Sequence, residues 1–297
     1  MKRWLGIGVT LSVMLVGVPA QGQTTSLVGV IDFHVHSGPD SRPRSVSDLE
    51  VARIAKRAGM RGLVFKNHFT MTADRAWLAM QEVSGVEIFG GVALNHAVGG
   101  LNAEAVRQLV AFSGGRGKVV WLPTFDAEFW MTRAGDPGKF VPVMRDGRPD
   151  PALGEIFDLI AQHDLVLAMG HSSPEEVLAL IPEARRRGVR QILVTHGLGQ
   201  QPSTEQVAAM VAQDAIIELV WLAVGNGEFT LADYAAAIRE HGAGHFLLSS
   251  DLGQEMSPLH TDGLVAFMNG LRAEGISDED IDLMIRRNPA RLLGLDP

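Results

Sequence analysis

Residues 28–36 read VGVIDFHVH, and the interpretation of the whole chain starts from this stretch. It is an apolar run rich in valine and isoleucine that ends in two imidazoles, His34 and His36. Continuous apolar runs are typical of parallel strands that are buried on both faces of a sheet. We therefore predict a buried parallel strand over residues 28–36, with polar side chains at its carboxyl end.

Seven further apolar runs follow, and a segment of helical character separates each run from the next. The predicted strands cover residues 62–68, 86–94, 118–124, 165–171, 191–196, 215–221 and 245–251. The predicted helices cover residues 47–58, 72–83, 103–112, 151–162, 174–187, 203–212, 231–241 and 262–273. Eight strand–helix pairs in succession predict an α/β fold, a (β/α)8 TIM barrel. An open doubly wound sheet shows the same alternation and remains the alternative.

Local signals complete this prediction. Extra C-terminal helices are expected over residues 277–293. Ser47 and Glu50 have the spacing of a capping box at the start of the first helix. Asp146-Gly147 predicts a hairpin turn within the long loop 126–150. No low-complexity linker follows residue 26, so we expect residues 27–297 to form a single domain.

The composition excludes several classes of protein. The chain has 297 residues, of which 46% are hydrophobic, and this fraction argues against intrinsic disorder. Its 26 Lys+Arg and 34 Asp+Glu give a formal charge of -8, which argues against a nucleic-acid partner. The absence of cysteine excludes disulfides and thiolate chemistry. A metal ion would therefore need ligands from His, Asp, Glu or a modified Lys.

The N-terminus has the three parts of a secretory signal peptide. Lys2 and Arg3 precede an apolar run over residues 4–18, and residues 18–20 (VPA) offer small or apolar side chains to a signal peptidase. The run is shorter than the ~20 residues of a spanning helix, although an uncleaved anchor is the alternative. We predict that residues 1–20 are a signal peptide and that the mature protein is periplasmic or secreted, without a membrane span.

Polar residues gather at the carboxyl ends of the predicted strands, where TIM barrels carry their active sites. Alternate residues of an extended chain point to the same side, so His34 and His36 face one centre. Five further candidates end other strands: Lys66, His68, His171, His196 and Asp251. Neutral imidazole and carboxylate are the ligands of catalytic zinc. We therefore predict a metal site at the mouth of the barrel.

This arrangement resembles the amidohydrolase superfamily of metal-dependent hydrolases. The resemblance covers about residues 28–296 and also includes the closing segment 288–295 (NPARLLGL). The residues that carry it, in their order along successive strands, are His34-Val35-His36, His171, His196 and Asp251. More narrowly, the chain is similar to an amidohydrolase-like group with KNH after strand two (residues 66–68) and SDLGQ after strand eight (residues 250–254).

The resemblance implies a role for each of these side chains. His34, His36 and Asp251 would bind the more buried of one or two divalent ions, for which we expect zinc. His171 and His196 would bind a second ion. In a one-ion site, His171 would be a ligand and His196 would polarise the substrate. Asp251 would also accept the proton of the attacking water.

One departure from the family pattern concerns the group that bridges two ions. Two-metal members often use a carboxylated Lys or a Glu from strand four or three, whereas the predicted strand four ends with TFD at residues 124–126. Lys66 is the nearest substitute, and Asp126 is a second candidate. Two roles are open for Lys66: a carboxylated bridge between ions, or an ammonium group that binds a substrate carboxylate or carbonyl.

Together these features predict a hydrolase that uses a metal-activated water to cleave a C–N or C–O bond of an amide, lactam or lactone-like small molecule. The expected substrate-binding residues are Lys66, His68, Arg42 and Trp221. Arg44 is an alternative to Arg42, since either guanidinium can hold a carboxylate, and two solvated loop arginines are the other interpretation. Large apolar residues in the loop 126–150 predict a lid or a contact within a homo-oligomer.

Two other classes of function remain open. Barrels with similar ligands also perform metal-dependent decarboxylation or hydration, which product analysis with a carboxylated substrate would distinguish. A non-catalytic periplasmic metal- or ligand-binding protein would keep the ligands without needing a proton acceptor at Asp251. The presence of that aspartate argues against such a protein.

Overall fold

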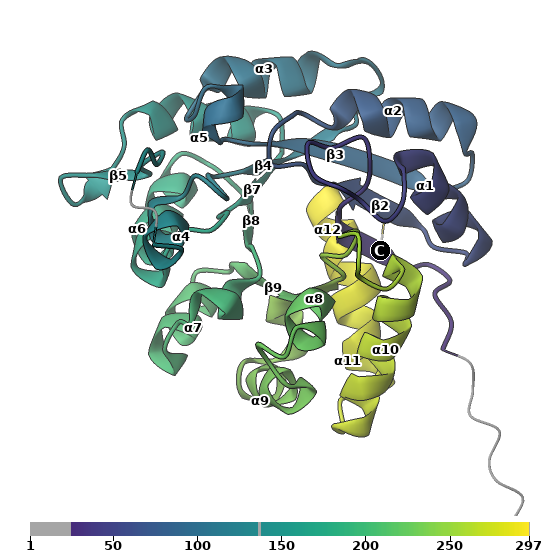
Figure 1. Cartoon of the computed structure of the whole chain (residues 1–297). Helices are drawn as coiled ribbons and strands as arrows, with labels where there is room; N and C mark the ends of the chain where they lie inside the picture. The colour runs from purple at the N-terminus through teal and green to yellow at the C-terminus, as the bar shows by residue number, and fades with distance from the viewer. Residues whose placement is uncertain (1–24, 136–137, 297) are drawn as a thin grey trace, which may run out of the picture.

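The computed structural model describes residues 25–135 and 138–296. Within these ranges, eight parallel strands form one sheet in the order β1-β2-β3-β4-β7-β8-β9-β10. They are β1 (Ile31–Val35), β2 (Gly62–Phe65), β3 (Glu87–Ala93), β4 (Gly117–Trp121), β7 (Val166–Ala168), β8 (Gln191–Val194), β9 (Ile216–Val220) and β10 (Phe246–Ser249). Figure 1 shows these strands around a common centre, with the helices outside them.

Backbone hydrogen bonds join the last strand to the first. The N–H of Asp251 donates to the carbonyl oxygen of His34 (3.0 Å), and the N–H of His36 donates to that of Leu252 (2.9 Å). The sheet therefore closes on itself. The prediction of a (β/α)8 barrel is confirmed, and the open sheet is excluded.

Eight helices, one after each strand, cover the barrel. They are α1 (Asp48–Arg57), α2 (Ala73–Glu82), α3 (Ala103–Ala111), α5 (Ala152–Gln162), α6 (Pro174–Arg186), α7 (Thr204–Val211), α9 (Leu231–His241) and α10 (His260–Ala273). The capping box of Ser47 and Glu50 is present at the start of α1. None of the helices in the described ranges combines the length and the apolarity that a bilayer span requires.

The strands are apolar throughout because both of their faces are buried. Alternate residues, such as Val119 and Trp121 of β4, point into the barrel and form an inner cluster. The residue between them, Val120, belongs to a second cluster that lies between the sheet and the helices. Side chains therefore fill the barrel axis, as they do in other barrels of this type.

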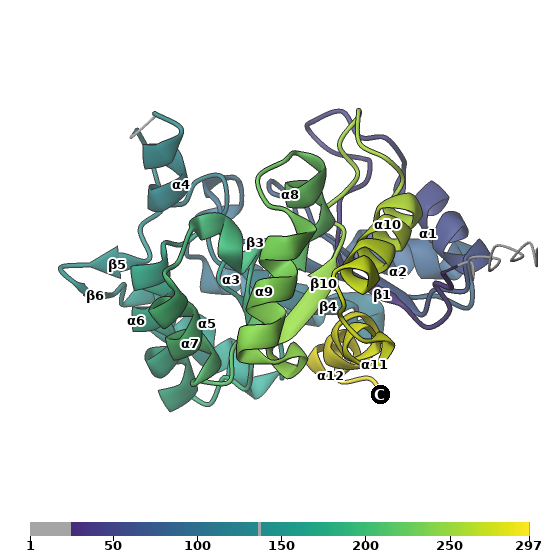
Figure 2. The ribbon, with the colours of Figure 1, turned by 90° about the horizontal axis from the view of Figure 1, so that it is seen from below.

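The predicted extra C-terminal helices are present and close the end of the barrel at which the strands begin. They comprise α11 (Asp278–Asp282), a π-helical turn (Leu283–Arg287) and α12 (Asn288–Leu293). The side chain of Asn288 donates to the carbonyl oxygen of Phe246 at the start of β10 (2.7 Å). Figure 2 shows α11 and α12 at one end of the barrel, while α8 (Trp221–Gly225) and α4 (Glu128–Arg133) lie at the other.

Several strands end earlier than predicted. The prediction placed His171, His196 and Asp251 inside strands, but β7, β8 and β10 end at Ala168, Val194 and Ser249. His196 and Asp251 have positive φ angles, 29° and 52°, which no strand can contain. The chain therefore turns at these positions, and the three side chains belong to the loops that follow the strands.

The long loop contains the predicted hairpin. Its arms are β5 (Met144–Arg145) and β6 (Arg148–Pro149), and both turn residues, Asp146 and Gly147, have positive φ. The predicted signal peptide, residues 1–20, lies outside the residues that the structure describes.

Replacement of Gly253 with Ala is expected to destabilise the closure of the barrel. Gly253 has a φ of +119°, and a Cβ at this position would lie 1.8 Å from the carbonyl oxygen of His36. Strained backbone alone costs ~1–3 kcal/mol, and the collision adds to that cost. Gly85→Ala is the matched control, because Gly85 also has a positive φ but no atom within 4 Å of the added carbon. Urea unfolding should show a larger loss for Gly253→Ala, and equal losses would contradict the collision.

Candidate metal centre at the barrel mouth

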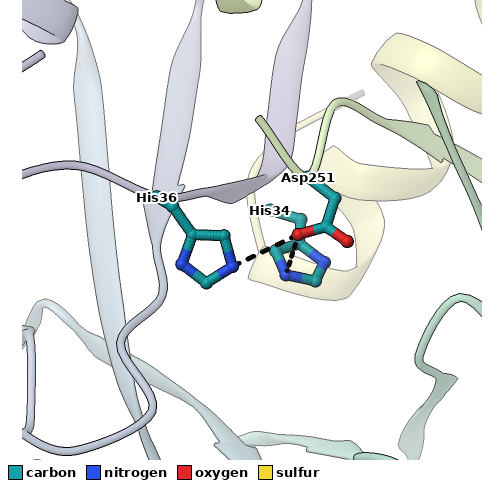
Figure 3. Close-up of side chains that lie close together, drawn as sticks. All are labelled: His34, His36 and Asp251. Carbon is teal, nitrogen blue, oxygen red and sulfur yellow. Dashed lines mark ion pairs between the residues drawn. The ribbon is translucent and has the colours of Figure 1, made fainter. Parts of the chain in front are cut away.

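Three side chains from the two joined strand ends lie close together at the barrel mouth (Figure 3). The Oδ1 atom of Asp251 lies 3.0 Å from Nε2 of His34 and 3.2 Å from Nε2 of His36. The ligand atoms of all three lie within 4.8 Å of one another, and all three residues are buried. One carboxylate oxygen therefore lies within 3.2 Å of both imidazole nitrogens.

His171 and His196 lie beside this cluster. Their Nε2 atoms face each other at 3.2 Å, and the ring of His196 stacks on that of His34 with centroids 6.0 Å apart. The structure therefore brings together the four histidines and Asp251, which carry the predicted resemblance. They come from four loops or strand ends that are far apart in the chain.

Glu218 is a member of the site that the sequence analysis did not identify. This buried residue of β9 contacts Nδ1 of His34 through both carboxylate oxygens (3.2 and 3.3 Å). It also accepts hydrogen bonds from the backbone N–H of His196 (3.0 Å) and from the hydroxyl of Ser249 (2.6 Å). A single carboxylate inside the apolar run 215–221 was the available signal, because an unpaired charge is seldom buried.

Electrostatics keep the carboxylates of the site ionised. Burial opposes ionisation of Asp251, but the neighbouring His34 and His36 outweigh it and hold its pKa well below the usual range. Burial likewise opposes ionisation of Glu218, yet His34 and His196 lower its pKa to about 2. Both groups are therefore negative at neutral pH.

For three of the four imidazoles, burial outweighs the attraction of the nearby carboxylates and keeps the ring neutral. Burial lowers the pKa of His36 to about 3 and that of His196 to about 4, and it lowers the pKa of His171 well below its ordinary value. His34 differs, because the charges of Asp251 and Glu218 overcome the effect of burial and raise its pKa. Neutral imidazole offers the lone pair that a metal ion needs.

Lys66 and His68 occupy the barrel mouth next to these groups. The Nζ atom of Lys66 is buried, has no hydrogen-bond partner among the described residues, and lies 5.5 Å from the centre of the Trp121 ring. Burial lowers the pKa of Lys66 to about 8. His68 contacts the hydroxyl of Thr124 through Nδ1 (2.8 Å), and burial lowers its pKa well below the usual value.

A cavity of about 330 Å³ opens onto the cluster. It is lined by site residues, among them His36, Lys66, His68, His171, His196 and Asp251, and by the aromatic side chains of Phe125 and Trp130. The ring of Trp130 in α4 lies 4.7 Å from that of His171, so the long loop contributes one wall.

The two loop arginines differ in their contacts. Arg44 is bound to Asp40 through Nε (2.7 Å) and Nη2 (2.6 Å). The guanidinium of Arg42 instead lies over the ring of Phe125, 4.3 Å from its centre, and has no acceptor among the described residues. Of the two, Arg42 is therefore the one that remains free to bind a ligand at the cavity.

Two predictions about the cavity are corrected. Trp221 does not line it, because α8 begins at this residue and rotates the ring against Phe267 of α10, with centroids 5.9 Å apart. Phe125 and Trp130 provide the aromatic wall instead. Asp126 does not reach the cluster either, because it turns outward and accepts the backbone N–H of His96 (2.7 Å).

The donor set fits a divalent metal ion. Four imidazoles and a carboxylate with nitrogen and oxygen donors converge in a buried pocket, and these are ligands that zinc and other transition metals accept. Oδ1 of Asp251 approaches Nε2 of both His34 and His36, and the Nε2 atoms of His171 and His196 approach each other to 3.2 Å, which indicates that the donors point toward shared positions. His34, His36 and Asp251 form one group of ligands, and His171 and His196 extend it.

Solved structures share the fold at low sequence identity. An amidohydrolase from Pseudomonas aeruginosa has a TM-score of 0.62 and 11% identity, over 89% of this chain and 95% of its own. A putative 2-pyrone-4,6-dicarboxylic acid hydrolase from Pseudomonas putida has a TM-score of 0.60 and 17% identity, over 92% and 100%. A dihydroxybenzoic acid decarboxylase from Polaromonas sp. with bound manganese has a TM-score of 0.57 and 15% identity, over 90% and 97%.

These similarities show that the chain shares the barrel fold that the predicted resemblance implies. Comparison with curated proteins returns no match. A family model described as "Family of unknown function (DUF6282)" matches residues 29–218, which include β1, the cluster histidines and Glu218. Since this match covers more than half of the 297 residues, the chain belongs to that family.

Proposed function

We propose that the protein is a metal-dependent hydrolase that cleaves a C–N or C–O bond of an amide, lactam or lactone-like small molecule. The observation that carries this proposal is the convergence of five donor side chains on a cavity large enough for a small molecule. The similarity to the two hydrolases in fold supports it.

His34, His36 and Asp251 would hold one divalent ion, and His171 and His196 would complete that site or hold a second ion. Such an ion lowers the pKa of a water molecule and polarises a carbonyl group. Zinc fits the donors, although one neighbour in fold contains manganese.

The chain itself supplies the proton transfer. The ion pairs of Asp251 with His34 and His36 both run through its Oδ1 atom. The neighbouring histidines keep this carboxylate ionised, which is the form that would accept a proton from the attacking water and pass it to the leaving group. In a one-ion site, His196 would contact and polarise the substrate.

Lys66 has two roles compatible with its position. Its buried Nζ would bind a substrate carboxylate or carbonyl oxygen, or it would carry a carboxyl group that bridges two ions. Metal analysis separates these roles, because a bridge requires two ions per chain. A density map around Nζ would show the added atoms directly.

The assay that tests the function compares metal-loaded protein with chelator-treated protein on a panel of esters, lactones and amides. We expect hydrolysis that depends on the metal. The manganese-containing decarboxylase supports one alternative, a decarboxylase or hydratase of the same barrel type. Release of CO₂ from a carboxylated substrate, without hydrolysis of any panel member, would favour that alternative. Metal binding without any turnover would favour a metal- or ligand-binding protein.

Arg42→Ala is expected to raise KM for carboxylated substrates at least about tenfold. A hydrogen bond to a charged group contributes ~1.5–3 kcal/mol, and the Arg42 guanidinium is free at the cavity mouth. Arg133→Ala is the control, because Arg133 also stacks on a phenylalanine, Phe129, but does not line the cavity. Steady-state kinetics with a carboxylated substrate and its neutral analogue provide the measurement. An equal rise in KM for both substrates would argue against a charge-specific contact.

We also propose that the protein is exported. Lys2 and Arg3 followed by the apolar run 4–18 support a cleaved signal peptide. Cell fractionation and N-terminal sequencing of the mature protein test this, with an expected start close to residue 21. An intact N-terminus in the membrane fraction would indicate an anchor instead.

A further inference from the structure

The side-chain amide of Asn95 has an orientation that its hydrogen bonds determine. Its Oδ1 accepts the backbone N–H of Thr124 (2.8 Å) and of Asp126 (3.3 Å). Its Nδ2 donates to the carbonyl oxygen of His68 (2.8 Å) and to Oγ1 of Thr124 (2.7 Å). A flipped amide would place its N–H groups against two backbone N–H donors. The hydroxyl oxygen of Thr124 is therefore an acceptor toward Asn95.

The hydroxyl of Thr124 then needs an acceptor for its own hydrogen. Thr124 is fully buried, and within the described ranges the available acceptor is Nδ1 of His68, at 2.8 Å. If Nδ1 carried a proton, Oγ1 would accept twice and its hydrogen would have no partner, which is costly for a buried group. The Thr124 hydroxyl therefore donates to Nδ1. A neutral imidazole in that position carries its proton on Nε2.

The packing around His68 directs this second nitrogen into the cavity. The ring of His36 covers one side (centroids 5.0 Å apart, 23° between planes), and the ring of Phe125 also stacks on it (3.8 Å, 24°). The Nδ1 edge is directed at Thr124. The remaining Nε2 edge faces the cavity that His68 lines together with Lys66 and His171.

We infer that His68 is a fixed hydrogen-bond donor, through Nε2–H, to the substrate oxygen that gains negative charge, and that Thr124 and Asn95 are the residues that position its proton. This role rests on the proposed hydrolase function. It separates His68 from the other imidazoles of the site, because a protonated Nε2 has no lone pair for a metal ion. Preorganised donors of this kind stabilise the charge that develops during cleavage of a carbonyl compound.

Nitrogen NMR of protein labelled with ¹⁵N-histidine tests the proton position without any substrate. His68→Gln identifies the signals of His68 by their loss. In the wild type we expect a protonated Nε2 and an unprotonated Nδ1, both unchanged in tautomer when Zn²⁺ is added. Thr124→Ser keeps the hydroxyl and should keep this tautomer, whereas Thr124→Val removes it and should produce a mixture. A proton on Nδ1 in the wild type, or coordination of Zn²⁺ by Nε2, would overturn the inference.

Kinetics then separate this role from a structural one. Thr124→Val is expected to lower kcat about tenfold with little change in KM. The variant loses the fixed Nε2–H donor of His68, and this donor matters in the transition state, where the substrate oxygen is charged, more than in the bound substrate. Thr124→Ser should recover most of that loss. If Thr124→Val hydrolyses the substrate as fast as the wild type, the role in catalysis is wrong even with the tautomer confirmed. If no panel member is hydrolysed at all, the proposed function fails, and the NMR result alone decides the proton position.

Discussion

Asp251→Asn is expected to lower kcat for the hydrolysed substrate by ~10²–10⁴-fold, the usual contribution of a positioned acid–base group. Asparagine keeps an oxygen at the Oδ1 position, which lies 3.0 and 3.2 Å from the two histidines, so a ligand atom remains. It lacks the negative charge and the basic Oδ2 atom that would accept a proton. The measurements are kcat and the metal content of the purified variant.

Asp126→Asn is the control for this variant. Asp126 was a candidate ligand by sequence, but its carboxylate accepts the backbone N–H of His96, and asparagine can preserve that contact. Its activity should remain close to that of the wild type. Undiminished hydrolysis by metal-loaded Asp251→Asn would remove Asp251 from the proton-transfer role.

Glu218→Gln is expected to weaken metal binding by ~10–100-fold, as loss of a partner of a metal-binding histidine commonly does. The Glu218 carboxylate contacts Nδ1 of His34 and accepts the backbone N–H of His196, so it orients two candidate ligands at once. The neutral amide removes the charge that favours the Nδ1–H form of His34. Competition with a metal-binding dye would give the dissociation constants of variant and wild type.

Glu87→Gln provides the matched control for Glu218. Glu87 also belongs to a strand and pairs with Arg116 (2.6 Å), but it does not line the cavity at the barrel mouth. Its metal affinity should stay within about twofold of the wild type. An equal loss in both variants would show that Glu218 acts through general stability. Full removal of the carboxylate in Glu218→Ala should also cost ~3–5 kcal/mol of unfolding free energy, because it leaves buried partners unpaired.

Sequence patterns were sufficient to predict the barrel, because strands and helices are specified by residues that are close together in the chain. Each buried strand is a continuous apolar run, and signals such as the Ser47–Glu50 box specify where a helix begins. The strand boundaries were less accurate, since His196 and Asp251 adopt the left-handed conformation and end the extended chain, although neither is a glycine. Loops that follow strands of a barrel meet at one end, so the convergence of the histidines could be predicted from their order.

The sequence by itself determined the barrel and the residues that gather at its mouth, because apolar periodicity and strand order act along the chain. Only the tertiary structure showed that Glu218 supports His34, that Trp130 replaces Trp221 in the cavity wall, and that Arg44 is bound to Asp40 while Arg42 is free. The contact between Thr124 and His68 is likewise visible only in the tertiary structure. Most of these contacts join segments that are distant in sequence, and their geometry depends on side-chain directions that no local pattern encodes.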